Sequence, residues 1–228
     1  MRRAHFLKAN HTSPLPLRLC WVDTEAANEH GLPEAGRQRL TFGVAIYEQY
    51  ADSDSIHPNR VDKHRFECAS GFWDWILSHA VSGRTIWVMA HNWNYDAGIL
   101  DVSHELPKRG WVLKKYINGK PPLIVRWEKD GAYVTLVDTL NWFTSALAVV
   151  GKSVGLPKLT MPDSKASPAL WDAYAWRDVE IIRAAFLSFR SFVREHDLGV
   201  MQPTLASQAF TAFRHRFMDT QILMHDNE

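Results

Sequence analysis

Hydrophobic positions along this chain follow two different periods, and the change from one to the other predicts a mixed α/β protein. Short alternating or almost wholly apolar runs indicate strands, and they cover residues 17–23, 39–50, 63–69, 84–91, 122–128 and 132–138. Apolar residues at helical spacing indicate helices, and they cover residues 71–81, about 95–107, 143–155, 169–196 and 204–218. This order of elements predicts a mixed β-sheet flanked by helices.

Three of these strands also carry information about their surroundings. Residues 84–91, RTIWVMAH, are apolar on both faces, which is typical of a central strand covered on both sides. Residues 122–128 and 132–138 flank Lys129-Asp130-Gly131, and a turn of this composition between two strands predicts a hairpin.

Paired acids follow the first predicted strand, LRLCWVD, where Asp23 and Glu25 stand one residue apart. Side chains at positions i and i+2 of a strand point to the same face. Two like charges there would repel each other and raise each other's pKa. A metal cation would offset that repulsion, whereas a polar loop beginning at Asp23 would explain the same residues without one. The spacing alone leaves both interpretations open.

Further carboxylates occur where they can join this pair. Asp96 lies at the start of the helix that follows strand 84–91, and Tyr174 and Asp178 are spaced i, i+4 on one face of the long helix. An Asp in the middle of a helix has poor propensity and needs a reason. Together the four carboxylates suit a pair of divalent cations, with oxygen ligands favouring Mg²⁺ or Mn²⁺.

Composition narrows the class of protein only slightly. The chain has 228 residues, 46% of them hydrophobic, which is enough for one large domain or two small ones without disulfides. A formal net charge of +1 neither requires nor excludes nucleic acid. Cys20 and Cys68 are expected to be small buried residues. Neither a signal peptide nor a membrane-spanning run is visible, so we expect a cytoplasmic protein without a membrane partner.

The order of these motifs resembles that of the DEDD family of 3′–5′ exonucleases, which have an RNase H-like fold. Asp23-Thr24-Glu25 matches the first motif, and Asn92-x-x-Tyr95-Asp96 matches the second in its family B polymerase form. Tyr174-x-x-x-Asp178 matches the third motif of the tyrosine subclass. The resemblance covers roughly residues 17–196 and implies an RNase H-like mixed β-sheet flanked by helices.

Outside the motifs the chain is similar to protein-primed family B DNA polymerases. Residues 137–143 and 147–159 resemble parts of their exonuclease domains, and residues 203–218 resemble the stretch that leads to the polymerase. The resemblance implies an exonuclease domain at 1–200 and a C-terminal helical segment at 201–228. No polymerase palm follows, which leaves two alternatives open: a piece of a longer polymerase, or a stand-alone nuclease of the same origin. A polymerase domain in cis or in trans is a candidate partner.

The resemblance also implies roles for individual residues. Asp23 would bridge two metal ions, Glu25 and Asp178 would complete the site of the attacking water, Asp96 would hold the second ion, and Tyr174 would orient the water. Asn92 would contact the single-stranded end, with Tyr95 and Trp93 as aromatic residues able to meet a base. Lys152 matches a lysine near the scissile phosphate, although a solvated helix lysine explains it equally well.

The expected function is hydrolysis of phosphodiester bonds at single-stranded DNA 3′ ends, as in proofreading during DNA replication. The same chemistry on RNA is one alternative, since the sequence shows no clear sensor of the 2′-hydroxyl group. A non-catalytic single-strand-binding or docking domain is the other. The complete set of acids argues against it, because a structural domain does not need four converging carboxylates.

Overall fold

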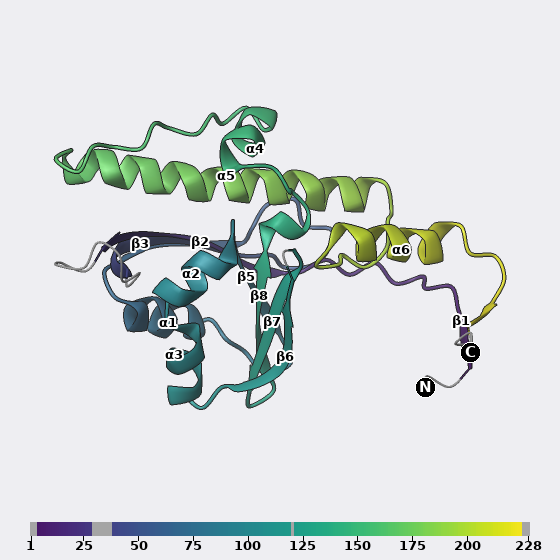
Figure 1. Cartoon of the computed structure of the whole chain (residues 1–228). Coiled ribbons are helices and arrows are strands. Elements are labelled where there is room, and N and C mark those ends of the chain that lie inside the picture. The colour runs from purple at the N-terminus through teal and green to yellow at the C-terminus, as the bar shows by residue number, and fades with distance from the viewer. Residues whose placement is uncertain (1–3, 29–37, 120, 225–228) are drawn as a thin grey trace.

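A computed structural model describes residues 4–28, 38–119 and 121–224 of the chain. In this part of the chain the main sheet has seven strands in the order β4-β3-β2-β5-β8-β7-β6 (Figure 1). The strands are β2 (Arg18–Asn28), β3 (Gln38–Gln49), β4 (Arg60–Phe66), β5 (Thr85–Ala90), β6 (Val112–Asn118), β7 (Leu123–Lys129) and β8 (Ala132–Asp138). Strand β2 pairs antiparallel with β3 and parallel with β5, and β5 pairs parallel with β8. The sheet is therefore mixed, as predicted.

Strand β2 lies near the middle of the sheet and is covered on both faces. Leu19 and Trp21 belong to one hydrophobic core, and the alternating residues Cys20 and Val22 belong to the other. All four side chains are fully buried. The nearly continuous apolar run in the sequence reflects this double covering.

Helices form a layer on each side of the sheet. They are α1 (Ala69–Leu77), α2 (Trp93–Ile99), α3 (Val102–Lys108), the 3₁₀ turn η1 (Thr139–Asn141), α4 (Leu147–Ser153), α5 (Pro168–Glu195) and α6 (Leu205–Arg216). Helix α5 lies along one face and packs Val179, Ile182 and Phe186 into the same core as Trp21, while α1, α2 and α3 lie on the opposite face (Figure 1). Helix α4 lies on the side of α5 that faces away from the sheet.

The predicted β-hairpin is confirmed, and its backbone angles explain why Asp and Gly occupy the turn. Strands β7 and β8 pair antiparallel, and the residues between them have positive φ angles, 50° at Asp130 and 76° at Gly131. Asp tolerates the left-handed region and Gly favours it, as a tight hairpin turn requires. The hairpin places β8 beside β5, which extends the sheet away from β2.

Several element boundaries differ from the prediction for identifiable reasons. Strand β2 continues to Asn28 because β3 pairs with it along its whole length, so Asp23 and Glu25 lie inside the strand and not after its end. The predicted helix 95–107 is two helices, because Asp101 has a φ of 46° between them. The predicted helix 143–155 contains only the seven residues of α4.

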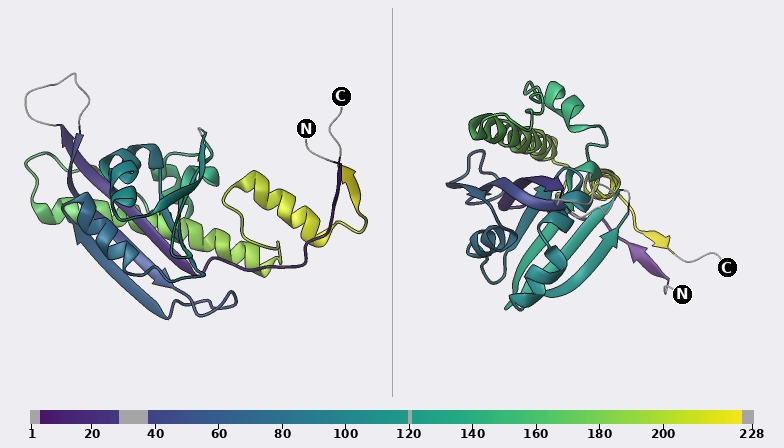
Figure 2. Two further views of the ribbon diagram at one scale, coloured as in Figure 1. Left: turned by 90° about the horizontal axis from the view of Figure 1, so that it is seen from below. Right: turned by 60° about the vertical axis from the view of Figure 1, so that its left-hand side comes forward.

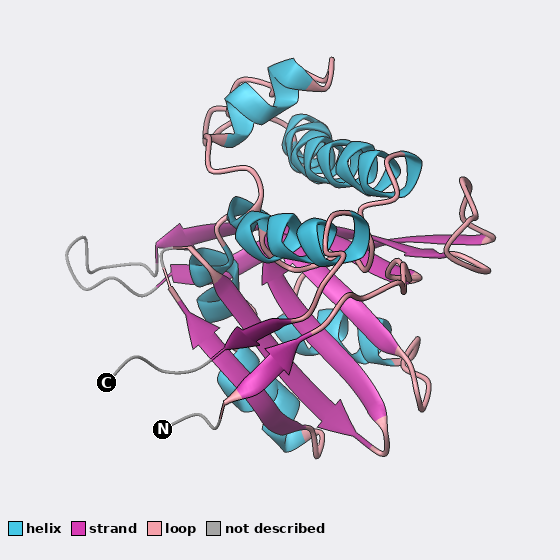
Figure 3. Cartoon of the chain, turned by 90° about the vertical axis from the view of Figure 1, so that its right-hand side faces the viewer, coloured by secondary structure: helices cyan, strands magenta, loops and turns pink. Residues whose placement is uncertain are grey.

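Three short strands were not predicted at all. Strand β6 exposes most of its side chains and therefore shows no apolar alternation. Strands β1 (His5–Leu7) and β9 (Ile222–Met224) form a separate two-stranded sheet that brings the two ends of the described chain together (Figures 2 and 3). None of the described helices is long and apolar enough to cross a membrane.

The two cysteines differ in environment. Cys20 is buried, as predicted, but Cys68 is exposed. Cys68 precedes the first residue of α1, where the chain turns at the surface, so the prediction that it is buried is wrong.

Candidate functional site

The position of the paired acids follows from the register of β2. Parallel pairing between β2 and β5 extends to Trp21 and Met89, and β5 ends at Ala90. Asp23 and Glu25 therefore continue past the end of β5 while β3 still pairs with them on the other side. They continue the same every-second-residue series as Leu19 and Trp21, so their side chains leave the sheet on the face that α5 covers.

Helix α5 brings the next two predicted residues to the same place. Tyr174 and Asp178 lie one turn apart and are 6% and 3% exposed. The Lys158 ammonium group lies 4.4 Å from the centre of the Tyr174 ring and pairs with Asp178 Oδ2. The other oxygen, Asp178 Oδ1, is buried and has no hydrogen-bond partner among the described residues. Such an atom is costly to bury unless a cation or a hydrogen bond compensates it.

Asp96 reaches the site from the other side of the sheet. It is 3% exposed and lies in the first turn of α2, which begins just after β5 ends. The Thr24 hydroxyl donates a 2.6 Å hydrogen bond to Asp96 Oδ1. Thr24 stands between Asp23 and Glu25 in β2, so this bond holds Asp96 close to the strand, where its charge raises the pKa of Asp23.

The electrostatics of the cluster is that of crowded carboxylates. Burial raises the pKa of Asp23 well above its ordinary value, and the charges of Asp96, Asp178 and Glu25 raise it further. Burial and Asp178 raise the pKa of Glu25 to about 7. Burial also raises the pKa of Asp96 to about 7, and it raises that of Asp178. The Lys158 cation lowers the pKa of Asp23, Glu25 and Asp178, which shows that a positive charge favours their ionised forms.

This donor set fits divalent metal ions. Four carboxylates on three elements offer only oxygen ligands, which suit Mg²⁺ or Mn²⁺. The unpartnered Asp178 Oδ1 is a ligand atom without another partner in the described chain. Among the described residues, ligand atoms of these four groups do not form a compact trio within 4.8 Å of one another.

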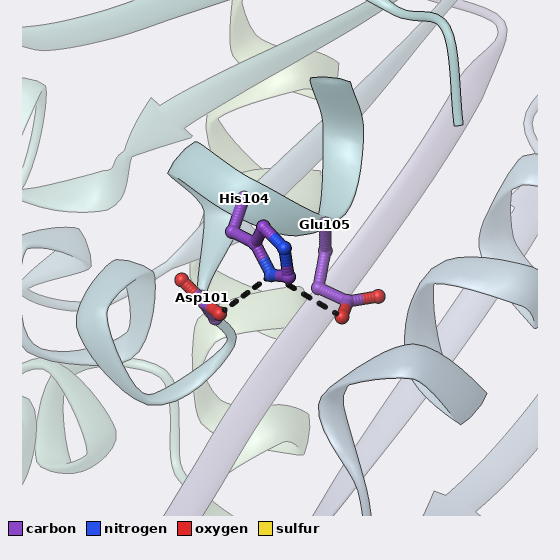
Figure 4. Close-up of side chains that lie close together, drawn as sticks. All are labelled: Asp101, His104 and Glu105. Carbon is purple, nitrogen blue, oxygen red and sulfur yellow. Dashed lines mark ion pairs between the residues drawn. The ribbon is translucent and has the colours of Figure 1, made fainter. Parts of the chain in front are cut away.

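A different group of side chains does form such a compact trio. Ligand atoms of Asp101, His104 and Glu105 lie within 4.8 Å of one another (Figure 4). His104 Nδ1 lies 3.3 Å from Asp101 Oδ2, and Glu105 is paired with Arg109 and lies 4.0 Å from Lys108 Nζ. Two cations already compensate Glu105, so this trio is a weaker candidate for a metal than the four carboxylates.

The structure separates the predicted nucleic-acid contacts into two groups. Asn92 and Tyr95 are exposed beside the acids, and Asn92 has a φ of 76°. The Asp138 carboxylate accepts hydrogen bonds from the backbone N–H groups of Asn92 and Trp93 at 3.0 and 2.9 Å, which holds this turn. Trp93 itself is fully buried and donates from Nε1 to the Val88 carbonyl. The prediction that Trp93 stacks on a base is wrong, because the turn at Asn92 directs its ring into the core.

The lysine in contact with the acids is Lys158, and the sequence analysis did not select it. Lys152 is exposed in the last turn of α4, whereas Lys158 lies in the following loop against Tyr174 and Asp178. A loop lysine shows no periodicity that could reveal this contact, so its role depends on the tertiary packing of the loop against α5.

Two cavities adjoin the cluster. One of about 500 Å³ lies beside the Asn92 turn, and its lining includes Asn94, Asn118 and Thr144. Another of about 430 Å³ is lined by Glu25 and Trp171, whose ring stands edge-on to that of Tyr174 with the ring centres 6.1 Å apart. Both are within the size range of ligand sites, but only the second is lined by one of the four acids, Glu25.

Comparison with known proteins shows the fold. No family model and no curated protein matches the sequence. The phi29 DNA polymerase complexed with primer-template DNA and incoming nucleotides is similar, with a TM-score of 0.59 and 14% identity over 87% of this chain and 34% of that chain. The same polymerase complexed with single-stranded DNA gives a TM-score of 0.58 and 15% identity over 87% and 35%. A family B DNA polymerase from the archaeon Pyrobaculum calidifontis gives 0.48 and 18% over 79% and 25%.

The likeness to the phi29 enzyme and the observed topology confirm the predicted fold class, α/β with a mixed β-sheet flanked by helices. The chain spans about a third of the length of that polymerase.

Proposed function

We propose that this protein is a metal-dependent 3′–5′ exonuclease that hydrolyses phosphodiester bonds at single-stranded DNA 3′ ends. The observation that carries the proposal is the convergence of Asp23, Glu25, Asp96 and Asp178 at the end of β5, with Tyr174 beside them. Divalent cations bound at this grouping would explain why several buried carboxylates with raised pKa values are tolerated in one place. A structural role alone offers no reason for it.

Each side chain has a role that its position supports. Asp23, Glu25 and Asp178 would hold one divalent cation, and Asp23 with Asp96 would hold the other. When bound, the two ions would activate a water molecule and stabilise the leaving 3′ oxygen. The Tyr174 hydroxyl would orient the attacking water, since it lies one helical turn from Asp178.

Lys158 would assist from the same side. Its ammonium group, placed between Tyr174 and Asp178, would neutralise negative charge that accumulates on the scissile phosphate. Asn92 and Tyr95, exposed at the turn before α2, would contact the terminal nucleotides. Contacts of this kind read little sequence, as removal of any mismatched end requires.

The likeness to part of a DNA polymerase supports a role in proofreading. We propose that residues 1–200 form the exonuclease domain and that residues 201–228 connect it to a polymerase domain, in cis or in trans. Shared fold with the phi29 enzyme and the position of α6 beyond the main sheet are consistent with this arrangement (Figure 1).

A nuclease assay tests the proposal. Single-stranded DNA labelled at its 5′ end would be incubated with the chain in Mg²⁺, Mn²⁺ or EDTA, and RNA of the same sequence would be run beside it. We expect a metal-dependent ladder of shortened products and nucleoside monophosphates. Asp23→Asn should abolish the ladder, and Asp101→Asn, a change of the same chemistry in the compact trio, should leave it intact. Intact DNA from folded wild-type protein in every metal would refute the proposal.

A further inference from the structure

A groove between α4 and α5 has no role in the site described above. It has a volume of about 560 Å³, and its aromatic lining consists of Trp142, Phe143, Phe189 and Phe192. Residues 185, 188, 189 and 192 of α5 line it at i, i+3, i+4 and i+7, so one face of the helix forms its floor. Phe192 is 49% exposed, which leaves a ring face free to contact a ligand.

The groove is continuous with the candidate site. Thr144 lines both this groove and the cavity beside Asn92. The carbonyl oxygen of the next residue, Ser145, accepts a 3.1 Å hydrogen bond from His91 Nε2, and His91 directly precedes Asn92. A strand that leaves the acids past Asn92 therefore meets the groove at Thr144.

The chemistry of the lining favours nucleobases over an apolar helix of a protein partner. Hydroxyl-bearing residues lie among the rings and the aliphatic side chains of the lining, and no carboxylate is among the lining residues; the hydroxyls are those of Thr144, Ser145, Ser153 and Ser188, and the aliphatic residues are Val149, Val150, Val154 and Ala185. The exposed Lys152 adjoins Ser153 at the end of α4. Rings that stack on bases, together with hydroxyl and ammonium groups that reach phosphates, are typical of single-strand binding without sequence preference.

We propose that this α4–α5 groove binds the bases of the single strand upstream of the bond that is cut, beyond the nucleotides held at Asn92. The proposal rests on the proposed function, because it takes the 3′ end to lie at the four carboxylates. It assigns Phe189 and Phe192 as stacking residues and Lys152 as a phosphate contact at some distance from the reacting atoms.

The experiment measures how affinity depends on strand length. Fluorescein-labelled oligo(dT) strands of about 3 to 12 nucleotides would be titrated with the full chain in EDTA, where no hydrolysis occurs, and followed by anisotropy. Wild-type affinity should rise with length. Phe192→Ala should weaken binding of the longest strand about tenfold and leave the shortest unchanged. Phe217→Ala, directly after α6 and 67% exposed, is the matched control and should change neither.

The outcomes separate this proposal from the proposed function. A loss by Phe192→Ala that is equal at all lengths, or absent at all lengths, would overturn the groove assignment. Hydrolysis of the shortest strand in Mg²⁺ is scored separately. Length-dependent binding without hydrolysis would reject the nuclease and keep the groove, whereas hydrolysis without length dependence would do the reverse.

Discussion

Replacing Asp96 by Asn should stabilise the metal-free protein at alkaline pH and have little effect at acidic pH. Asp96 is 3% exposed, and burial raises its pKa from an ordinary value of 3.8 to about 7. Each pKa unit corresponds to about 1.4 kcal/mol, so keeping this carboxylate ionised at pH 8 costs the fold roughly 4 kcal/mol. The Asn side chain removes the charge and can still accept the hydrogen bond from Thr24.

The sign of the pH dependence follows from the raised pKa. Between its unfolded and folded pKa values, Asp96 is protonated in the folded state and ionised in the unfolded chain. Its stabilising contribution is therefore fully present below about pH 4 and is lost as the pH rises through about 7. We expect Asp96→Asn to raise the free energy of unfolding by roughly 2–4 kcal/mol at pH 8 and by about 1–2 kcal/mol at pH 5, with no gain left below about pH 4.

Thermal melting in EDTA at the two pH values measures this difference. For a chain of this size the gain at pH 8 corresponds to a rise in Tm of about 5–10 °C. Adding Mn²⁺ should stabilise the wild type much more than the variant, because the variant lacks a ligand. Asp101→Asn is the control, since Asp101 is exposed and Asn also tolerates its positive φ. An equal loss of stability by Asp96→Asn at both pH values would refute the reasoning and make Asp96 a structural residue.

Three further substitutions test other parts of the account. Tyr174→Phe removes only the hydroxyl group. We expect kcat for single-strand hydrolysis to fall about 10–100-fold, with little change in KM or in the Tm measured by melting. A changed KM with a normal kcat would contradict the role of the hydroxyl in orienting water. Lys158→Met leaves the carboxylate of Asp178 buried and unpaired. This should lower the free energy of unfolding of the metal-free protein by about 1–3 kcal/mol at pH 8. Urea unfolding in Mn²⁺ should show that the bound ion restores most of this stability. Gly43→Ala would place a Cβ against the ring of Phe66 and should cost about 1–3 kcal/mol in urea unfolding, whereas Gly98→Ala, in α2 with open space around it, should be neutral or stabilising.

The sequence was sufficient for those parts of the fold that depend on local patterns. A few neighbouring residues were enough to predict three features: the strand β5 from its apolar run, the hairpin from Asp130-Gly131, and the helix α5 from its helical period. The i, i+2 spacing of Asp23 and Glu25 likewise predicts a shared face, which the alternation of β2 supports. Strand β6 was not predicted, because most of its side chains are exposed and its sequence shows no alternation of apolar and polar residues.

The missing parts of the site depend on tertiary structure. Lys158 contacts Asp178 only because the loop after α4 folds back on α5, and no neighbouring residue in the sequence signals that path. The burial of Trp93 was not predicted, because it depends on the turn at Asn92, where φ is positive, and the sequence pattern does not show that turn. The end of β2 was misjudged because its length depends on β3 and not on its own composition.

Calorimetric titration with Mn²⁺ tests most directly the central claim that the four carboxylates form a site for two cations. Wild-type protein should bind two ions per chain at the four carboxylates, Asp178→Asn should lose at least one of them, and His104→Ala should bind as the wild type does. Undiminished binding by Asp178→Asn together with loss in His104→Ala would place the metal at the compact trio of Asp101, His104 and Glu105 and contradict the account.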